Sequence, residues 1–506
     1  MKILPVEKIR EADLYTIKNE PVSDIDLMER AASECFYWCI SNIPHHKRVF
    51  VFCGPGNNGG DGLAIARMMY LEGYKVSVLL TGPDHRLSPS CATNYQRFKD
   101  ISGSDLRILQ KGEALPEIQA DDIVLDALLG NGLARPVEGF FAEIISHINR
   151  SNVRVISIDV PSGLFCDQTN RRNTKSDIIH ADFTLTFFPP KLALFFQEND
   201  LYIGDWKLLD IGIMKGFIDK VKVKNYFLDE PEIGKFLKKR NKYAHKGTFG
   251  HSLLICGSLG KFGAAVLSAR ASLRSGSGLV TVRTPSEGSF ILQLAVPEAM
   301  VSIDPQKDFL SEVPDLAAYT SIGIGPGIGT SGQTARMVKL LIQNAGQPLL
   351  FDADAINILS ENKTWLGFLP KNSIFTPHPK EFERLIGKSA DQFERNRMQR
   401  EFSFKYQCYM VLKGAHTAVT TPDGNCYFNS TGNPGMATGG SGDVLTGIIA
   451  GLKAQGYTSF ESCLLGVYIH GLAGDLALSE KGYEALIAGD IIDNLGKAFQ
   501  SLYGKF

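Results

Sequence analysis

The chain repeats one local order almost from end to end: a short apolar run, a polar or glycine-rich loop, and a helical segment. In the first half, an apolar run at residues 48–53 precedes a glycine loop at 54–62 and a helical run at 63–72. Strands that alternate with helices form parallel sheets covered on both faces, so the pattern predicts an α/β protein. The carboxyl ends of such strands lie at one edge of the sheet, where we expect ligands to bind.

The pattern occurs in two separate halves. In the first half we predict a helix around 25–35 and further strands at 75–81, 122–126 and 154–159. The second half restarts with a strand at 252–256, a glycine loop at 257–263 and a helix at 264–274, followed by strands at 279–282, 320–324, 349–352, 373–376 and 409–413. A length of 506 residues favours two to three domains. We therefore predict domains over 1–220 and 244–506, joined by a basic linker at 221–243.

Composition narrows the class of protein. A net charge of −1 provides no field that would recruit nucleic acid or an anionic membrane. The amino-terminal segment lacks a signal-type apolar stretch, and no run approaches the ~20 apolar residues of a membrane span. Nine cysteines occur without CxxC pairs, and Cys35 and Cys39 have no accompanying histidine, so we expect reduced core thiols rather than a zinc site. These features predict a cytoplasmic protein.

The segment at residues 433–443 carries the clearest chemistry, reading Asn-Pro-Gly-Met-Ala-Thr-Gly-Gly-Ser-Gly-Asp before a helical run from 444. Glycines at a helix start leave backbone N–H groups uncovered where the helix dipole is positive, which is typical of an anion site. Asp443 would repel phosphate, so its presence favours a base that takes a proton from a hydroxyl while the amides hold a phosphoryl group. The alternative is a glycine-rich turn in which Asp443 only caps the helix.

The glycine loop of the first half matches GxGxxG, but it does not indicate a redox dinucleotide site. The second strand ends without the acidic residue that would hold a ribose, and Asp61 lies inside the loop. Asn58, Asp126 and Ser162 follow three different strands, and their hard oxygen donors would suit a weakly hydrated cation such as potassium. The alternative is that Asp126 and Asp159 merely cap the turns that follow them.

These motifs together carry a family resemblance. The runs Leu-Met-Glu-Arg-Ala from 27, Gly-Pro-Gly-Asn-Asn-Gly-Gly-Asp-Gly from 54, Asp-Ala-Leu-Leu-Gly-Asn-Gly from 126 and Asp-Val-Pro-Ser-Gly from 159 resemble the NAD(P)H-hydrate epimerase domain. The runs His-Lys-Gly-Thr-Phe-Gly-His from 245, Gly-Pro-Gly-Ile-Gly from 325, Thr-Pro-His-Pro-Lys-Glu from 376 and Gly-Gly-Ser-Gly-Asp from 439 resemble the NAD(P)H-hydrate dehydratase. In this order they resemble the bifunctional NAD(P)H-hydrate repair enzymes over nearly the whole chain.

The resemblance implies a Rossmann-like three-layer αβα domain followed by a ribokinase-like αβα domain. It implies that the first domain interconverts the R and S forms of NADHX and NADPHX, and that the second dehydrates the S form with ADP, releasing AMP and phosphate. ATP stays open as the donor, and Mg²⁺ is a further candidate ion. The C6 hydroxyl lies beside the ring nitrogen and leaves once protonated, so a carboxyl group is needed, for which we expect Asp159. Lys191 is a second candidate, with an ordinary surface lysine as the alternative.

The same resemblance places further residues. In the first domain it implies a hydrate site formed by Asn57, Asn58, Gly59, Gly60, Asp61, Gly130, Asn131, Gly132, Leu133, Ala134, Arg135, Pro136 and Asp159, and a potassium site formed by Asn58, Asp126 and Ser162. In the second domain it implies Ala264, Gly327, His378 and Asp443 at the hydrate, and Lys413, Gly414, Ala415, His416, Thr417, Gly439, Gly440, Ser441 and Gly442 at the nucleotide. His378 lies between two prolines and could instead be a packed loop histidine.

Two other functions fit parts of the chain. Gly-Gly-Ser-Gly-Asp alone also fits a ribokinase-type small-molecule kinase, with a non-catalytic binding domain in front of it. A protein- or RNA-binding role for that first domain is disfavoured for RNA by the near-neutral charge. Homo-oligomers are common for such folds, so we expect one here, although no patch in the sequence identifies an interface.

Overall fold

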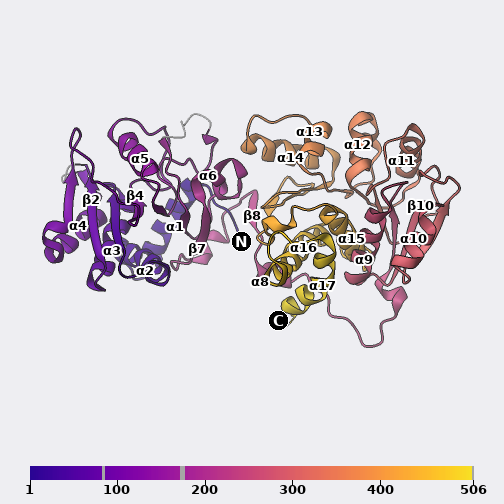
Figure 1. Cartoon of the computed structure of the whole chain (residues 1–506), viewed down its shortest axis with the longest axis horizontal. Helices are drawn as coiled ribbons and strands as arrows, with labels where there is room; N and C mark the ends of the chain where they lie inside the picture. The colour runs from indigo at the N-terminus through magenta and orange to yellow at the C-terminus, as the bar shows by residue number, and fades with distance from the viewer. Residues whose placement is uncertain (83–85, 171–176, 504–506) are drawn as a thin grey trace. The chain divides into compact units, whose positions relative to one another are not determined.

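The computed structural model describes residues 1–82, 86–170 and 177–503. They form two compact units. The first unit is Lys2–Val223 together with residues 391–393, and the second is Met1 with the rest of the chain from Lys224 onward. Both units are α/β with helices on two faces of a sheet, as predicted (Figure 1).

The first unit contains a seven-stranded sheet, parallel throughout, in the order β3-β2-β1-β4-β5-β6-β7. Its strands are β1 (Arg48–Cys53), β2 (Lys75–Thr81), β3 (Leu106–Leu109), β4 (Ile123–Ala127), β5 (Arg154–Ile158), β6 (Phe183–Phe187) and β7 (Asp205–Leu209). Its helices are α1 (Val6–Asn19), α2 (Asp24–Asn42), α3 (Asn57–Leu71), α4 (Pro89–Ser102), α5 (Phe140–Arg150), α6 (Asp200–Ile203) and α7 (Lys215–Ile218).

Side chains that alternate along the strands belong to two hydrophobic cores, one on each face of the sheet. Val49 and Val51 of β1 pack with α2, α3 and α4, whereas Phe50 and Phe52 pack with α5 on the opposite face. Successive side chains of a strand point to opposite faces, so a strand buried on both sides is apolar at every position. Helix α1 belongs to a third, smaller cluster, in which it packs against α2 and residues 211–218.

Helix α3 begins earlier than the sequence indicates. Residues 57–62 were expected in a loop, but they form the first turns of α3, because its glycines allow the helix to approach the sheet. A Cβ on Gly59 would lie 1.7 Å from the Gly54 carbonyl oxygen, and one on Gly62 would lie 2.6 Å from the Ala127 Cβ. Gly59 and Gly62 therefore serve the close packing of α3 against the sheet.

This packing gives a stability prediction. Gly59→Ala should lower the free energy of unfolding of the first unit by on the order of 3 kcal/mol, because backbone must move to admit the methyl group. Urea unfolding followed by circular dichroism measures it. Gly56→Ala is the matched control, since a Cβ there meets nothing within 4 Å. An equal loss in both variants would contradict the packing role of Gly59.

The second unit contains a ten-stranded sheet in the order β11-β10-β9-β12-β13-β14-β15-β16-β17-β8. Its strands are β8 (Asn225–Phe227), β9 (His251–Ile255), β10 (Leu279–Pro285), β11 (Met300–Asp304), β12 (Ser321–Ile324), β13 (Leu349–Phe351), β14 (Ile374–Phe375), β15 (Tyr409–Leu412), β16 (Ala418–Thr420) and β17 (Cys426–Phe428). Its helices are α8 (Glu230–Gly234), α9 (Phe262–Arg274), α10 (Gly288–Ala295), α11 (Gly332–Asn344), α12 (Ala353–Glu361), α13 (Pro379–Leu385), α14 (Gln392–Tyr406), α15 (Ser441–Ala454), α16 (Ser459–Lys481) and α17 (Ala488–Tyr503).

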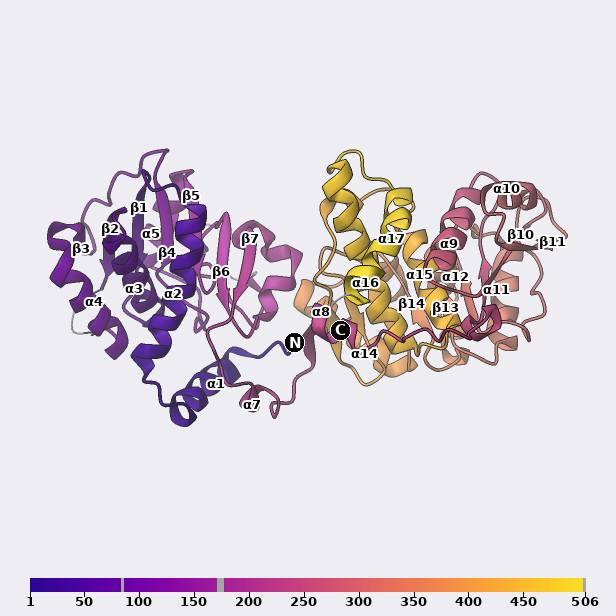
Figure 2. The ribbon, with the colours of Figure 1, turned by 90° about the horizontal axis from the view of Figure 1, so that it is seen from below.

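The two faces of this sheet carry different helices. Leu254 packs with α9, α15, α16 and α17, and its neighbours Leu253 and Ile255 pack with α11 to α14. Figure 2 looks onto the α16 and α17 side. The sheet is not wholly parallel as expected, because β15, β16 and β17 form an antiparallel meander. Short turns can join antiparallel neighbours, so no helix is needed between these strands.

Three further expectations can be compared with the structure. The segment 221–243 does not stay outside the domains over its whole length, since β8 pairs with β17 and Ile233 of α8 is fully buried in the second unit. Helix α16 is long and apolar enough to cross a membrane, although the sequence led us to expect no such segment. Most of it is buried against α15 and α17, so core packing accounts for its apolar character. All nine cysteines are buried and unpaired, as predicted.

Candidate active sites

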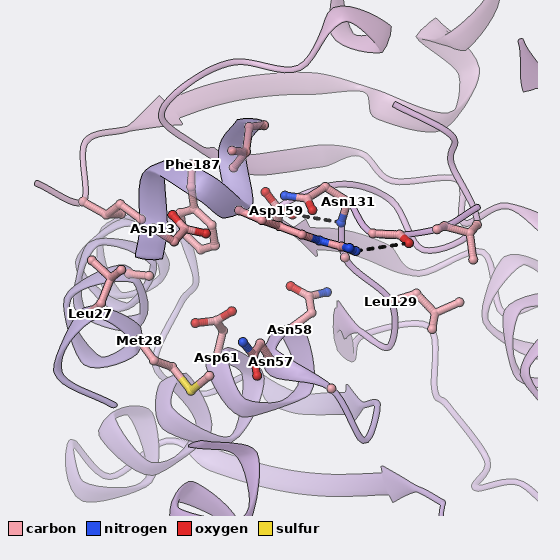
Figure 3. A pocket seen from close by; sticks show the side chains of 18 of the residues that line it. Asp13, Leu27, Met28, Asn57, Asn58, Asp61, Leu129, Asn131, Asp159 and Phe187 are labelled. Atoms are coloured by element: carbon pink, nitrogen blue, oxygen red, sulfur yellow. Dashed lines mark hydrogen bonds between the residues drawn. The ribbon is translucent and has the colours of Figure 1, made fainter. Parts of the chain in front are cut away.

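A cavity of about 610 Å³ lies at the carboxyl ends of β1, β4 and β5 in the first unit, where the parallel strands predicted a ligand site (Figure 3). The loops after these strands line it together with α1, α2, the start of α3, Phe141 of α5 and the segments that follow β6 and β7. Of the expected hydrate residues, it is lined by Asn57, Asn58, Asp61, Gly130, Asn131, Gly132, Leu133 and Asp159. The described residues Gly59, Gly60, Ala134, Arg135 and Pro136 do not line it.

Asp159 and Lys191 form a buried ion pair in this cavity. The Lys191 Nζ lies 2.6 Å from Asp159 Oδ1, and it also donates to the Phe187 carbonyl at 2.8 Å. Lys191 is only 1% exposed, which excludes the surface-lysine alternative. Asp159 has a φ of 67°, a left-handed conformation that is strained for a residue with a side chain and is often found at functional sites. Its Oδ2 accepts from the distant Asn131 amide at 3.1 Å, so it does not simply cap its own turn.

The three candidate cation ligands gather around the turn after β4. Ser162 donates to Asp126 Oδ1 at 2.6 Å through its hydroxyl, and the Leu129 amide donates to the Ser162 Oγ at 2.8 Å. A Cβ on Gly130 would lie 3.3 Å from Asn58 Cβ, which places that side chain beside the same turn. Asp126 also accepts from the Leu128 amide at 3.3 Å, so it caps the turn as well.

This donor set fits a cation. The side-chain amide of Asn58 is buried, and neither its oxygen nor its nitrogen has a hydrogen-bond partner among the described residues. Asp126 is fully buried, and burial raises its carboxyl pKa, although the Ser162 and Ser157 hydrogen bonds oppose that shift. A bound cation would stabilise the charged carboxylate and give Asn58 the partner that it lacks.

The cavity also contains an acid that the sequence did not identify. Asp13 projects from α1 toward the same space as Asp61 and Asp159 (Figure 3). Burial raises the Asp13 pKa to about 7, with Lys191 opposing the shift and Asp159 adding to it. Burial likewise raises the pKa of Asp61 well above its usual range. One signal was available: Asp13 lies beside the buried stripe Ile9, Ala12 and Thr16, where an unpaired acid is unusual.

In the second unit, Asp443 lies in the first turn of α15. The helix begins at Ser441, three residues earlier than expected, after Gly440 at a φ of 94°. No described residue makes a hydrogen bond or ion pair with the Asp443 carboxylate, so the helix-cap alternative finds no support. Burial raises its pKa to about 7, Asp352 adds to the shift, and Lys413 opposes it. The first turn of a helix leaves backbone N–H groups without intrahelical acceptors, so an acid and anion-binding amides are adjacent here.

The Lys413 ammonium group lies beside this turn. The Lys413 Nζ lies 3.0 Å from Asp352 Oδ1, and it would lie 3.2 Å from a Cβ on Gly442. Thr446 of α15 donates to the other oxygen of Asp352 at 2.7 Å. Burial lowers the Lys413 pKa, but Asp352, Glu381 and Asp443 together outweigh this effect, and the pKa stands above its usual range. The ammonium therefore stays charged next to the glycine turn. Sequence reasoning missed Asp352, although it directly follows a buried strand.

Several other residues predicted for the second unit lie in three loops. A Cβ on Gly327 would lie 3.3 Å from Ala264 Cβ, so these two are neighbours, as a shared site requires. Gly414 and Thr417 are joined within their own loop, where the Thr417 hydroxyl donates to the Gly414 carbonyl at 3.0 Å. His378 caps α13, because its Nδ1 accepts from the Lys380 amide at 3.1 Å. The ring therefore has a structural role at this cap, but its side chain is 44% exposed rather than packed, and its assignment to the hydrate stays a prediction.

Comparison with known proteins shows which families the two units match. Residues 24–193 match the family described as YjeF-related protein N-terminus, and residues 252–497 match the family described as NAD(P)H-hydrate dehydratase. The chain is 36% identical to the bifunctional NAD(P)H-hydrate repair enzyme Nnr of Coxiella burnetii, covering 96% of this chain and 97% of that relative.

This chain belongs to the bifunctional NAD(P)H-hydrate repair enzyme family. Its relative in Escherichia coli is 32% identical over 93% of this chain and 88% of that protein. Among solved structures, the chain is similar to the ADP/ATP-dependent NAD(P)H-hydrate dehydratase of Bacillus subtilis, co-crystallised with ATP and Mg²⁺. That similarity has 30% identity and a TM-score of 0.49, and covers 55% of this chain and 98% of that one.

Proposed function

We propose that this chain repairs hydrated NADH and NADPH in two steps. The first unit interconverts the R and S hydrates, and the second converts the S hydrate to the reduced dinucleotide with ADP as the phosphoryl donor. Family membership over nearly the full length supports both activities in one chain. The observation that carries the proposal is the Asp443 carboxylate, which has no described side-chain partner and lies in the amide-rich first turn of α15.

The first step needs an acid at the hydrate hydroxyl. Protonation lets the C6 hydroxyl leave as water, and the ring nitrogen stabilises the resulting cation. Water can then add to either face, returning a proton to the protein. Asp159, held by Lys191 and by the Asn131 amide, is the group we assign to this proton transfer. The partner interactions fix its orientation, which general acid–base catalysis requires.

The second step needs a better leaving group than hydroxide. Asp443 would take the proton of the C6 hydroxyl as its oxygen attacks the terminal phosphorus of ADP, forming the phosphate ester and releasing AMP. Loss of phosphate from C6 and of a proton from C5 then forms the C5–C6 double bond and gives NADH or NADPH. The amides of residues 439–442 and the Lys413 ammonium beside Gly442 would stabilise the charge that develops on the transferred group. Mg²⁺ would supply further neutralisation of the phosphates.

We assign K⁺ to Asn58, Asp126 and Ser162, where it would complete a buried oxygen site. K⁺ at ten times its dissociation constant should stabilise the first unit by about 1.4 kcal/mol relative to choline. Differential scanning calorimetry in the two chloride salts measures this shift. Asp126→Asn should remove the difference between the salts, while Asp121→Asn, an exposed acid nearby in sequence, should retain it. Equal melting of the wild type in both salts would contradict the site.

A direct assay tests the overall function. Incubation with a mixture of R and S NADHX should regenerate the reduced-nicotinamide absorbance completely when ADP is present, because the first unit supplies S hydrate as it is used. Running ADP and ATP in parallel identifies the donor. A ribokinase-type kinase for another alcohol would restore no absorbance. Recovery that stops once the S hydrate is used would show that the first unit does not epimerise.

A further inference from the structure

The first unit contains more acid–base groups than one proton transfer requires. Asp13 of α1 and Asp159 after β5 reach the same cavity from different elements (Figure 3). Asp159 has two partners, whereas the Asp13 carboxylate makes no hydrogen bond or ion pair with any residue of the described ranges. A carboxyl group that is largely buried without a partner reduces stability, so its presence in a ligand cavity favours a function.

We propose that Asp13 is a second acid–base group of the epimerisation, acting at C6 of the hydrate from a different wall of the cavity than Asp159. The inference rests on the epimerase function proposed for this unit. Inversion at C6 requires one group to protonate the departing hydroxyl on one face of the ring. It requires a second group to deprotonate the water that arrives on the other face.

The protons balance in such a scheme. One carboxyl donates its proton, the C6–O bond breaks, and water leaves with both bonding electrons. A second water then forms the new C6–O bond with its lone pair and gives its extra proton to the other carboxylate. The reverse reaction uses the two groups in exchanged roles. A single acid could serve both faces only if the nicotinamide ring turned over inside the cavity.

Asp13 suits the role better than its neighbours do. Its pKa of about 7 leaves it ready both to donate and to accept at neutral pH. Asp24 accepts a hydrogen bond from Ser90, which ties its carboxylate to the protein. Asp61 is buried in the first turns of α3, and this burial raises its pKa well above its usual range. The charged groups that line the cavity around Asp13 are Lys191, Asp159, Asp24, Asp61 and Arg10.

The test uses the full chain with purified R NADHX, without ADP, and follows formation of the S hydrate by chromatography above a no-enzyme blank. Asp13→Asn should lower kcat by about 100-fold or more. Asp13→Glu should retain part of the rate. Glu7→Gln, which removes an exposed carboxylate from the same helix, should leave the rate unchanged.

The pH profile separates chemistry from structure. The wild-type rate should show an ionisation near pH 7, and that limb should be absent in Asp13→Asn. If Asp13→Asn does not fold, a displaced limb in Asp13→Glu provides the same evidence. In ¹⁸O-labelled water, the S product should contain the label at C6.

Three results would overturn the inference. A wild-type rate and pH profile in Asp13→Asn would exclude Asp13 as an acid–base group while leaving the epimerase function intact. Epimerisation without oxygen exchange would exclude the loss and return of water. A wild type that converts no R hydrate at all, but dehydrates the S hydrate with ADP, would instead overturn the function proposed for the first unit, and this inference with it.

Discussion

We expect Asp443→Asn to abolish repair of S NADHX, with kcat reduced by roughly 10³-fold or more. Asparagine preserves the shape of the side chain but cannot take the hydroxyl proton as phosphoryl transfer proceeds. Absorbance regain with saturating ADP measures the loss. Nucleotide binding, followed by calorimetry, should change little or become tighter, because the substitution removes a negative charge beside the phosphates.

The pH dependence of folding stability serves as a control that the Asp443→Asn variant is folded. The Asp443 pKa is raised from 3.8 to about 7, so the folded state binds more protons and stability falls as pH rises from about 4 to about 7. Asp443→Asn removes that cost, which amounts to up to about 4 kcal/mol, and should raise the melting temperature of the second unit most above pH 7. Retained turnover in a folded variant would contradict the base role.

The second large effect concerns the buried pair in the first unit. Asp159→Ala should abolish interconversion of the R and S hydrates, because it removes the group that we propose transfers the proton at C6. It should also destabilise the first unit by about 3–5 kcal/mol, since it leaves the Lys191 ammonium buried without its counter-ion. Chiral chromatography of R NADHX measures the first effect, and chemical denaturation measures the second.

A double variant separates the two effects. Asp159→Asn with Lys191→Met removes both charges and keeps the volumes, so stability should return toward that of the wild type, whereas epimerisation should not. Lys47→Met is the matched control, because that lysine pairs with Asp121, which is mostly exposed. If the double variant recovers epimerisation, Asp159 and Lys191 have only a structural role.

Much of the fold could be predicted locally. The strand bounds at 48–53 and 75–81 agree with β1 and β2, because continuous apolar runs between polar loops are typical of buried parallel strands. β15 lies within the strand predicted at 409–413, but β16 and β17 were not predicted, since strands of three residues carry too little periodicity. The start of α3 was also missed, because four glycines among residues 54–60 indicate a loop until the close contact of Gly59 with Gly54 is known.

The sequence by itself determined the glycine turns, the acids that follow buried strands and the order of two α/β halves, because these features depend on neighbours along the chain. Only the tertiary structure decided that Lys191 is buried against Asp159, that Lys413 lies beside Gly442 next to Asp352, and that Asp13 reaches the cavity. The pKa values and partners of these groups depend on burial and on charges brought together from distant segments. Neither quantity is encoded in any local stretch of sequence.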